Sequence, residues 1–409
     1  MVSADDRGMD GNRVREACEP DDRDLGAPQQ AEAKAYGHRK LYCGLADTAV
    51  SLACLGLVTF AYAQPIDQVL MSCAWLHNRW LRLGGYFLVL IMLQLAVSFP
   101  IAAYSGFVLE HQYGLSRQSF RRWLGRYALQ NVLIAAFGLA LVEGLFLVIA
   151  LTAGYWWLAA AGASFLVNVL LGQLAPVLIL PLFYKVERLD DPELAQRFRR
   201  LAEGTDLRIE GIYRMQLSRE TVKANAMLAG LGRTRRVILG DTLIEGFRHE
   251  EIEVVLAHEI GHHVHRHMLK MMLAGLAFSF AAFFLCDFLV RLYVTRTEGT
   301  LDYASLPTST LPLIMLTVSL FSLLISPAQN ALSRHFERQA DRYALQRTGV
   351  RADFQSAFRR LARLNKADLD PHPLEVILFH DHPPIAERLA MAEEGSAKDE
   401  GPRTKDDRS

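Results

Sequence analysis

Long apolar segments separated by short polar ones dominate the pattern of the chain. Six of them are long enough to cross about 30 Å of hydrocarbon as helices. They lie at about residues 45–64, 83–109, 127–152, 156–184, 268–292 and 311–332. Hydrophobic residues make up 51% of the chain and the mean hydropathy is positive, which excludes a soluble enzyme with a single anchor. The pattern predicts a mainly α-helical multispan membrane protein with about six transmembrane helices.

Positive charges are distributed unevenly between the two sets of connecting loops. The loops on the side of the N-terminus carry Arg39, Lys40, Arg117, Arg121, Arg122, Arg126, Lys185 and Arg188. The loops on the opposite side carry mainly Arg79, Arg82 and Arg296. Because Lys and Arg are enriched in cytoplasmic loops, we expect both termini in the cytoplasm. The composition, rich in Ala, Leu and Arg, indicates a bacterial inner membrane.

The polar segments divide the chain into further regions. Residues 1–40 are polar and lack the apolar core of a signal peptide, so they are expected to form a disordered, uncleaved extension. The tail over 393–409 is similarly polar and is expected to be disordered. Between them we expect a four-span membrane region, a cytoplasmic catalytic segment, a two-span membrane region and a second cytoplasmic segment, at residues 41–185, 186–267, 268–332 and 333–392. The two cytoplasmic segments should together form a small α+β region.

A His-Glu-x-x-His motif, His258 to His262, lies near the end of the first cytoplasmic segment. Residues four apart on a helix share a face, so both imidazoles can reach one metal ion. Zinc lowers the pKa of a bound water to about 7, and Glu259 lies where a carboxylate can take its proton as the water attacks a carbonyl. The motif therefore predicts one zinc ion and a general base. A histidine-rich, solvated helix end is the alternative interpretation.

A zinc hydrolase also needs a third protein ligand and an open fourth position. His265 is two turns from His258, so on an unbroken helix it cannot converge with both motif histidines on one ion. Glu337 and Asp341 lie four residues apart after the sixth apolar segment. In this interpretation Glu337 binds the metal and Asp341 orients a ligand histidine, while a charged helical surface is the alternative. Both motifs fall on one side of the membrane, as two intervening spans require.

Short strands are predicted in the first cytoplasmic segment, at residues 212–217 and 236–239, with a glycine turn at 230–232 between them. A strand edge beside a zinc site holds an extended substrate in many peptidases, by main-chain pairing. Asn225 and Ala226 lie on that predicted edge as candidate substrate-binding residues. Asn225 would anchor a substrate carbonyl or, alternatively, bond its own backbone.

Taken together, these motifs resemble those of the type I CAAX prenyl proteases, a family of integral-membrane zinc metallopeptidases. The motifs stand in the order of that family: Asn225-Ala226, Asp241-Thr242-Leu243, His258-Glu259-Ile260-Gly261-His262, Glu337-x-x-x-Asp341, and His382-Pro383-Pro384 with Arg388. Further matches lie at residues 108–115 and 181–185. The resemblance covers roughly residues 45–392, and the combination is far more specific than any single motif.

The resemblance implies several features beyond the spacing of the ligands. Family members enclose a water-filled chamber within a ring of membrane helices, and in eukaryotes they cleave peptide bonds near a prenylated C-terminal cysteine. It implies that Glu337 is the third zinc ligand and that His382 and Arg388 stabilise the oxyanion of the tetrahedral intermediate. One departure concerns the first of the family's usual seven spans, whose place is taken here by a polar segment. This difference should affect how substrates enter the chamber more than it affects the chemistry of the zinc site.

Charge and cysteine content narrow the function further. Lys and Arg together number 44, as do Asp and Glu, so no global charge attracts nucleic acid. The five cysteines have no disulfide or metal spacing. The sequence thus predicts a membrane zinc endopeptidase for peptide or protein substrates that are prenylated or membrane-associated. A heat-shock-type membrane zinc peptidase, which normally has fewer spans, is one alternative. A non-catalytic zinc-containing binding or transport protein, which would not need Glu259, is the other.

Overall fold

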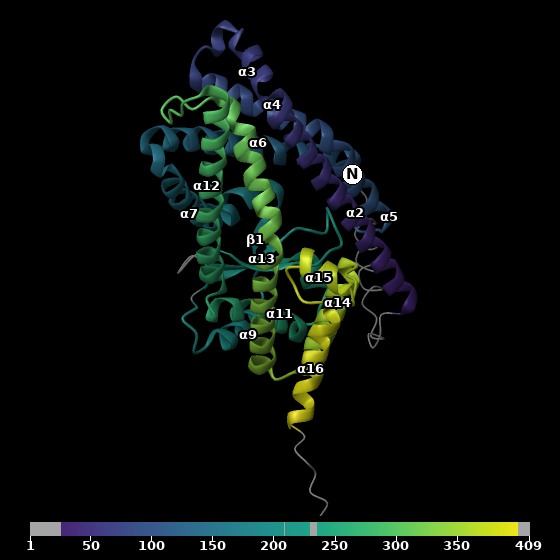
Figure 1. The fold of residues 1–409 in the computed structure, drawn as a ribbon. Coiled ribbons are helices and arrows are strands. Elements are labelled where there is room, and N and C mark those ends of the chain that lie inside the picture. The colour runs from purple at the N-terminus through teal and green to yellow at the C-terminus, as the bar shows by residue number, and fades with distance from the viewer. Residues whose placement is uncertain (1–25, 208, 230–234, 400–409) are drawn as a thin grey trace, which may run out of the picture.

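The computed structural model of the chain describes residues 26–207, 209–229 and 235–399. Long helices form an elongated bundle, and one end of it carries a small sheet and the C-terminal helices (Figure 1). Parts of three predictions lie outside the described residues: most of the polar extension (1–25), the glycine turn (230–232) and the end of the tail (400–409).

Five helical stretches in the described part of the chain are long and apolar enough to cross a membrane. They are Ala27–Met71, Arg79–Gln112, Phe120–Leu174, His267–Glu298 and Thr308–Thr348. The third contains two predicted segments, because α6 (Phe120–Thr152) and α7 (Trp156–Leu174) are separated only by a short 3-10 turn. Ala153 in this turn has a positive φ of 44°. The predicted multispan helical architecture is therefore confirmed, with the six predicted segments distributed over five continuous helical stretches.

The first helix begins earlier than the polar pattern indicates. α2 (Ala27–Leu57) follows Gly26, has Pro28 in its first turn, and continues through η1 (Val58–Tyr62) into α3 (Ala63–Met71). Its first residues are mostly Ala, Gln, Glu and Lys, which favour helices. The predicted boundary at residue 40 is therefore wrong. The polar residues extend the first apolar helix, just as α16 (Ile385–Asp399) runs past the boundary predicted at residue 393.

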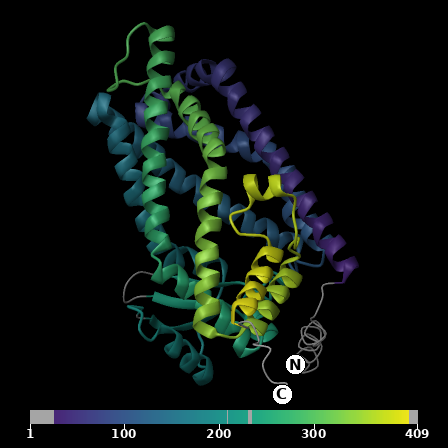
Figure 2. The ribbon, with the colours of Figure 1, turned by 60° about the horizontal axis from the view of Figure 1, so that its bottom comes forward.

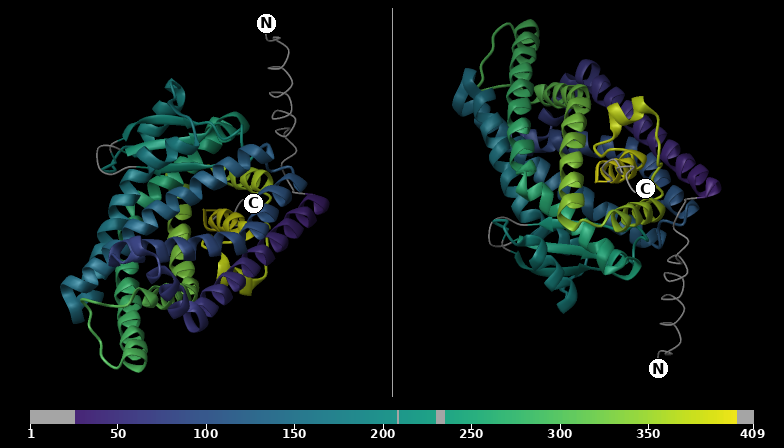
Figure 3. Two further views of the ribbon diagram at one scale, coloured as in Figure 1. Left: turned by 90° about the horizontal axis from the view of Figure 1, so that it is seen from above. Right: turned by 90° about the horizontal axis from the view of Figure 1, so that it is seen from below.

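Most remaining helices connect or cover these long ones. They are α8 (Leu180–Phe183), α9 (Pro192–Ala202), α10 (Asp241–Gly246), α11 (His249–Val264), α14 (Arg351–Asn365) and α15 (Pro373–Phe379), whereas α4 (Arg79–Ala103) with α5 (Leu109–Gln112), α12 (His267–Glu298) and α13 (Leu311–Thr348) belong to the long stretches themselves. Short 3-10 and π-helical turns complete the described helices. Figures 2 and 3 show that the C-terminal helices α14 to α16 lie between α13 and α2. This places the last segment of the chain against the same helix that carries Glu337.

A four-stranded sheet forms the strand part of the predicted α+β region. Its strands are β1 (Val186–Arg188), β2 (Ile209–Met215), β3 (Ala226–Ala229) and β4 (Arg235–Gly240). The order is β1-β2-β4-β3, with β2 parallel to β4 and the other pairs antiparallel. The two predicted strands overlap β2 and β4. The sequence pattern missed β3, which pairs with β4 and leaves one edge of the sheet open beside α11.

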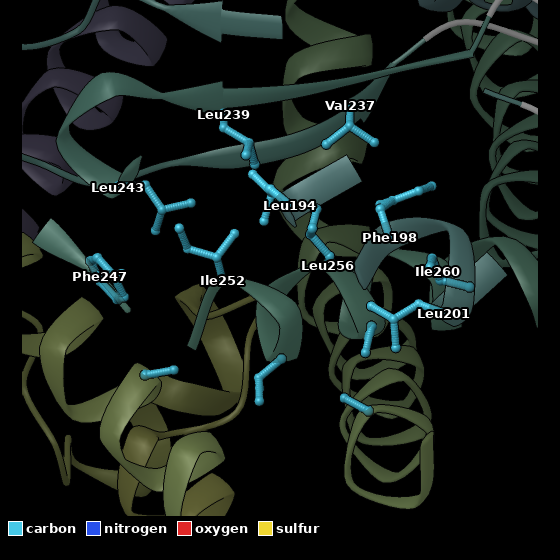
Figure 4. Close-up of a cluster of buried hydrophobic side chains, with 14 of the residues drawn as sticks. Leu194, Phe198, Leu201, Val237, Leu239, Leu243, Phe247, Ile252, Leu256 and Ile260 are labelled. Carbon is cyan, nitrogen blue, oxygen red and sulfur yellow. The ribbon is translucent and has the colours of Figure 1, made fainter. Parts of the chain in front are cut away.

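One face of the sheet packs on helices through a regular apolar pattern. In Figure 4, Leu194 and Phe198 of α9 meet Val237 of β4 and the apolar side chains of α11. The α11 contribution comes from Ile252, Leu256 and Ile260, which recur every four residues and are fully or almost fully buried. Each such side chain contributes roughly 1.5–3 kcal/mol when fully buried. This cluster fixes α11 against the sheet, so its opposite face turns towards α13.

A buried carboxylate within the apolar part of α12 is fully paired. Asp287 accepts hydrogen bonds from Trp156 Nε1 (2.7 Å) and the Tyr303 hydroxyl (2.6 Å), and it pairs with Arg291 at 2.7 Å. A charge in a membrane span is costly unless it is satisfied by neighbours. The pairing therefore gives Asp287 a structural role in joining α7 to α12.

The two helices that carry the predicted ligands approach closely at Gly261 of α11. A Cβ at this position would lie 3.0 Å from Ala340 Cα, 3.2 Å from the Ala340 carbonyl oxygen and 3.2 Å from Tyr343 Cβ. Only a residue without a side chain fits against this backbone. The contact brings the second motif histidine of α11 beside the Glu337 turn of α13.

Replacing Gly261 with Ala should separate α11 from α13. We expect a loss of about 1–3 kcal/mol in stability from overpacking, together with weaker metal binding, because the ligands sit on both helices. Thermal unfolding with and without added zinc measures both effects. Gly275→Ala on α12 is the matched control, since a Cβ there has nothing within 4 Å. Equal melting temperatures for the two variants would contradict this prediction.

Candidate active site

Three predicted metal ligands converge where α11 meets α13. His258 Nε2 lies 3.1 Å from His262 Nε2 and 3.3 Å from Glu337 Oε2. Glu337 Oε1 lies 3.2 Å from His262 Nε2. One donor atom from each residue falls within 4.8 Å of the others. The helix period explains the histidine pair, and the Gly261 contact explains why Glu337 reaches them.

The chemistry of this donor set fits a metal ion. The Nε2 atoms of His258 and His262 lie 3.1 Å apart, and both face the buried carboxylate of Glu337. A buried carboxylate needs a compensating positive charge or a metal ion, and a cation among the three donors would supply it. Two histidines and one glutamate form a known donor set of catalytic zinc, which keeps a fourth position open. The side chain of His262 is 28% exposed, so the donor set is accessible from one side.

Asp341 holds the other ring nitrogen of His258. Its Oδ1 lies 2.9 Å from His258 Nδ1, as the sequence pattern led us to expect. Arg388 in turn donates to both Asp341 oxygens, from Nε at 2.8 Å and from Nη2 at 2.5 Å. Its guanidinium stacks 3.8 Å above the Phe358 ring, and the residue is only 6% exposed. The role of Arg388 in stabilising the oxyanion stays a prediction, and in the structure its buried side chain holds Asp341 behind His258.

The carboxylates of Asp341 and Glu337 control the pKa of His258. Burial by itself lowers the pKa of His258, but the contacts with Asp341 and Glu337 outweigh burial and raise that pKa to about 9. A metal ion must then displace a proton to bind, as is general for metal-ligating histidines. Metal affinity is therefore expected to fall as the pH drops below this value.

His262 has a partner that the sequence analysis missed. His262 Nδ1 lies 3.0 Å from Nδ1 of His267, which is 2% exposed. His267 is five residues further on, a spacing that does not share a helix face. It reaches His262 because α11 ends at Val264 and Arg266 adopts a left-handed φ of 54°. Spacing rules for unbroken helices give no signal for such a residue.

His265 lies in this break between the helices and is not part of the donor set. Its ring stacks on His267, with centroids 5.4 Å apart. Among the described residues, the side chains that are arranged to hold a metal ion are His258, His262 and Glu337. Glu337, and not His265, is thus the residue that completes the triad of donors.

His382 is the exposed cationic candidate beside the donor set. Its Nε2 lies 3.6 Å from Glu337 Oε1, and its side chain is 57% exposed. Asp381 Oδ1 contacts His382 Nδ1 at 2.8 Å and raises the pKa of this imidazole. His382 therefore presents a ring nitrogen to the open side of the site, where Arg388 does not.

Glu259 lies on α11 directly after the first donor. It is partly exposed, and within the described residues no hydrogen bond or ion pair engages its carboxylate. Its neighbours at the same site are all paired. A carboxylate left without a partner beside a metal donor set can accept a proton from water.

The predicted substrate residues lie at the start of the edge strand β3. The side chain of Asn225 is exposed, and its carbonyl accepts a hydrogen bond from Gly240 N at 2.8 Å. Ala226 pairs with Leu239 of β4. Asp241 supports the neighbouring loop by accepting from the backbone N–H groups of Leu217 and Ser218. β3, which begins at Ala226 directly after Asn225, packs beside α11.

Replacing Glu337 with Ala should sharply weaken metal binding, because a site with three protein ligands has no spare donor. The metal content of the purified variant, measured by mass spectrometry after dialysis against a weak chelator, tests this. Glu375→Ala provides a control, since that carboxylate pairs with His380 rather than with a donor histidine. Full zinc occupancy in Glu337→Ala would reopen His265 as the third ligand.

Comparison with known proteins supports the family resemblance over most of the chain. Residues 188–395 match peptidase family M48, and residues 25–185 match the CAAX prenyl protease N-terminal region, described as five membrane helices. The uncharacterised metalloprotease YhfN of Bacillus subtilis is 28% identical over 321 residues, which cover 77% of this chain and 74% of that protein. CAAX prenyl protease 1 of Saccharomyces cerevisiae is 29% identical over 330 residues, covering 76% and 72%.

The fold is also shared with a solved structure. The crystal structure of S. mikatae Ste24p superimposes with a TM-score of 0.80 over 94% of both chains, at 23% sequence identity. This likeness concerns the arrangement of the helices, while the sequence matches carry the family. The chain therefore belongs to peptidase family M48, and it is an integral-membrane metallopeptidase with a CAAX prenyl protease N-terminal region.

Proposed function

We propose that the protein is a zinc metalloendopeptidase that hydrolyses peptide bonds within membrane-associated substrates. The observation that carries this proposal is the convergence of His258, His262 and Glu337, with the partly exposed Glu259 following the first of these donors in α11. A structural zinc site has no need of a free carboxylate at its open side. The donor set and the base together match the requirements of a hydrolytic site.

Each residue of the site has a separate task in this proposal. His258, His262 and Glu337 would hold the zinc ion, which would supply a Lewis acid for the scissile carbonyl and a water of lowered pKa, about 7. Glu259 takes the proton of the attacking water and later delivers it to the leaving amine. His382, whose pKa is raised by the hydrogen bond to its neighbour Asp381, would donate to the oxygen on which negative charge develops. Asp341 and Arg388 hold His258 in place behind the site.

The surroundings of the site favour an extended, apolar substrate. The edge strand β3 offers main-chain groups for pairing with a peptide, and the exposed amide of Asn225 lies at its start. An apolar cavity of about 530 Å³ lies between α7, α12 and α13 and begins at Met268, next to His267. A lipid-like or hydrophobic part of a substrate fits such a cavity. We therefore propose that substrates are membrane-associated, with prenylated peptides as the chemically simplest example.

The positive-inside distribution supports a location of the site on the cytoplasmic side of the membrane. Among the basic residues on this side, Lys40 of α2 pairs with Glu110 of α5, and Arg122 and Arg126 of α6 pair with Glu220 in the segment between β2 and β3. We propose a bacterial inner membrane with both termini in the cytoplasm. Substrates would then present their cleavage sites from the cytoplasmic leaflet.

Two alternatives are less well supported. A heat-shock-type quality-control peptidase would share the zinc chemistry, but residues 25–185 match the CAAX prenyl protease N-terminal region. A non-catalytic zinc protein would not need Glu259 to be free of partners. The general base therefore separates the proposed enzyme from a binding or transport protein.

Replacing Glu259 with Gln should abolish turnover while zinc and fold are retained. Loss of a general base typically costs roughly 10²–10⁴-fold in rate, and Gln has nearly the same shape as Glu. Cleavage of a fluorogenic hydrophobic peptide, with and without a farnesyl group, measures the effect in detergent. Glu250→Gln in the first turn of the same helix is the control, since its carboxylate pairs with Arg197. Near-normal turnover in Glu259→Gln would refute the assigned chemistry.

Replacing His382 with Ala should lower kcat and kcat/KM by similar factors and leave KM almost unchanged, because a donor to the developing oxyanion acts on the transition state. We expect a loss of roughly 10²–10³-fold at normal zinc content. His380→Ala is the matched control, because that side chain contacts Glu375 rather than the donor set. An unchanged kcat with raised KM would place His382 in the substrate groove, and lost zinc would make it structural.

A further inference from the structure

The Nδ1 atoms of the two donor histidines have chemically different partners. Nδ1 of His258 faces the carboxylate of Asp341, whereas Nδ1 of His262 faces the imidazole of His267 at 3.0 Å. Two further hydrogen bonds lead from His267 away from the donor set. His267 Nε2 lies 2.9 Å from Gln339 Oε1, and Gln339 Nε2 lies 3.0 Å from His335 Nε2. Four side chains from α11, α12 and α13 thus form one chain of hydrogen bonds that ends at the donor set.

Metal binding at His262 gives this chain a single direction. A histidine that binds a metal through Nε2 carries its proton on Nδ1. His262 Nδ1–H then donates to Nδ1 of His267, so His267 must be neutral and carry its own proton on Nε2. That proton is donated to Gln339 Oε1, and the Gln339 amide N–H is donated to His335. Every donor in the chain meets an acceptor, and no other assignment satisfies all three contacts with His262 on a metal.

His267 is held too firmly to be an incidental neighbour. It is the first residue of α12, is 2% exposed, and stacks on Phe336 with centroids 4.5 Å apart and an interplanar angle of 12°. Phe336 immediately precedes Glu337 in α13. The left-handed backbone of Arg266 turns the chain so that the His267 ring faces back towards His262. Backbone, stacking and hydrogen bonds thus fix one orientation of this imidazole.

We propose that His267 is a positioning residue that fixes the tautomer and the ring orientation of His262 for metal binding, with Gln339 holding His267 in turn. The proposal rests on the proposed zinc function of the site. Partners behind metal ligands commonly change metal affinity by about 10–100-fold. His267 supplies this function without adding charge, whereas Asp341 on the other donor is a carboxylate balanced by Arg388. A neutral acceptor at His262 leaves more of the positive charge of the ion available to a substrate carbonyl.

Zinc affinity and rescue by a substitution that retains the acceptor test this role. The full chain in detergent is compared as wild type, His267→Leu and His267→Asn, by competition with a chromophoric zinc chelator. Leu removes the acceptor, while the Asn side-chain oxygen can replace Nδ1. We expect a zinc affinity about 10–100-fold weaker for His267→Leu and closer to wild type for His267→Asn. His263→Leu is the control, since that imidazole contacts Arg235 rather than a donor.

Two further measurements separate positioning from a merely structural role. The visible absorption spectrum of the cobalt-loaded protein should change in His267→Leu and return towards wild type in His267→Asn, because it reports the orientation of the ligands. If His267→Leu does not fold, Gln339→Leu tests the next link and should weaken zinc binding by a smaller factor. Equal zinc affinity for wild type, His267→Leu and Gln339→Leu would overturn the inference. A wild-type protein that binds no zinc would instead overturn the proposed function on which it rests.

Discussion

The close approach of α11 to α13 at Gly261 is the contact on which the site depends. α12 separates the two helices in the chain, yet a Cβ added at Gly261 of α11 would lie only 3.0 Å from the Ala340 backbone of α13. Apolar residues on the other face of α11 press it against the sheet (Figure 4). His258 and His262 therefore have one position relative to Glu337. The metal site is built by packing, and the membrane helices α12 and α13 hold the packing in register.

Charge balance explains why this packing needs a cation. Glu337 and Asp341 are both buried, and Arg388 hydrogen-bonds Asp341 while its Nη2 lies 3.9 Å from Glu337 Oε2. Two buried carboxylates need more positive charge than one arginine supplies, so a divalent ion between the histidines and Glu337 would stabilise the site. The same charges raise the pKa of His258 and make protons compete with the metal. Folding, metal binding and pH dependence are thus coupled through one small group of residues.

Sequence patterns predicted the elements of the site whose geometry follows from a regular repeat. The helix period placed His258 and His262 on one face and Glu337 with Asp341 on another, and alternation of side chains located two of the four strands. Residues that act across a break or between distant elements gave no such signal. His267 depends on the left-handed backbone of Arg266, and the burial of Arg388 depends on where α16 docks against α13. The polar start of α2 gave no helical signal for a related reason, because distant segments of the chain supply its few buried contacts. One of them is the hydrogen bond from the Tyr36 hydroxyl to Glu110.

X-ray absorption spectroscopy at the zinc edge of the purified, zinc-loaded protein tests the central claim most directly. We expect two imidazole nitrogens at about 2.0–2.1 Å and carboxylate and water oxygens at about 2.0–2.2 Å, with no sulfur ligand. In Glu337→Ala the carboxylate contribution should disappear, while the two imidazoles stay in any residual site. A spectrum with three imidazoles, or with sulfur at about 2.3 Å, would contradict a site made by His258, His262 and Glu337.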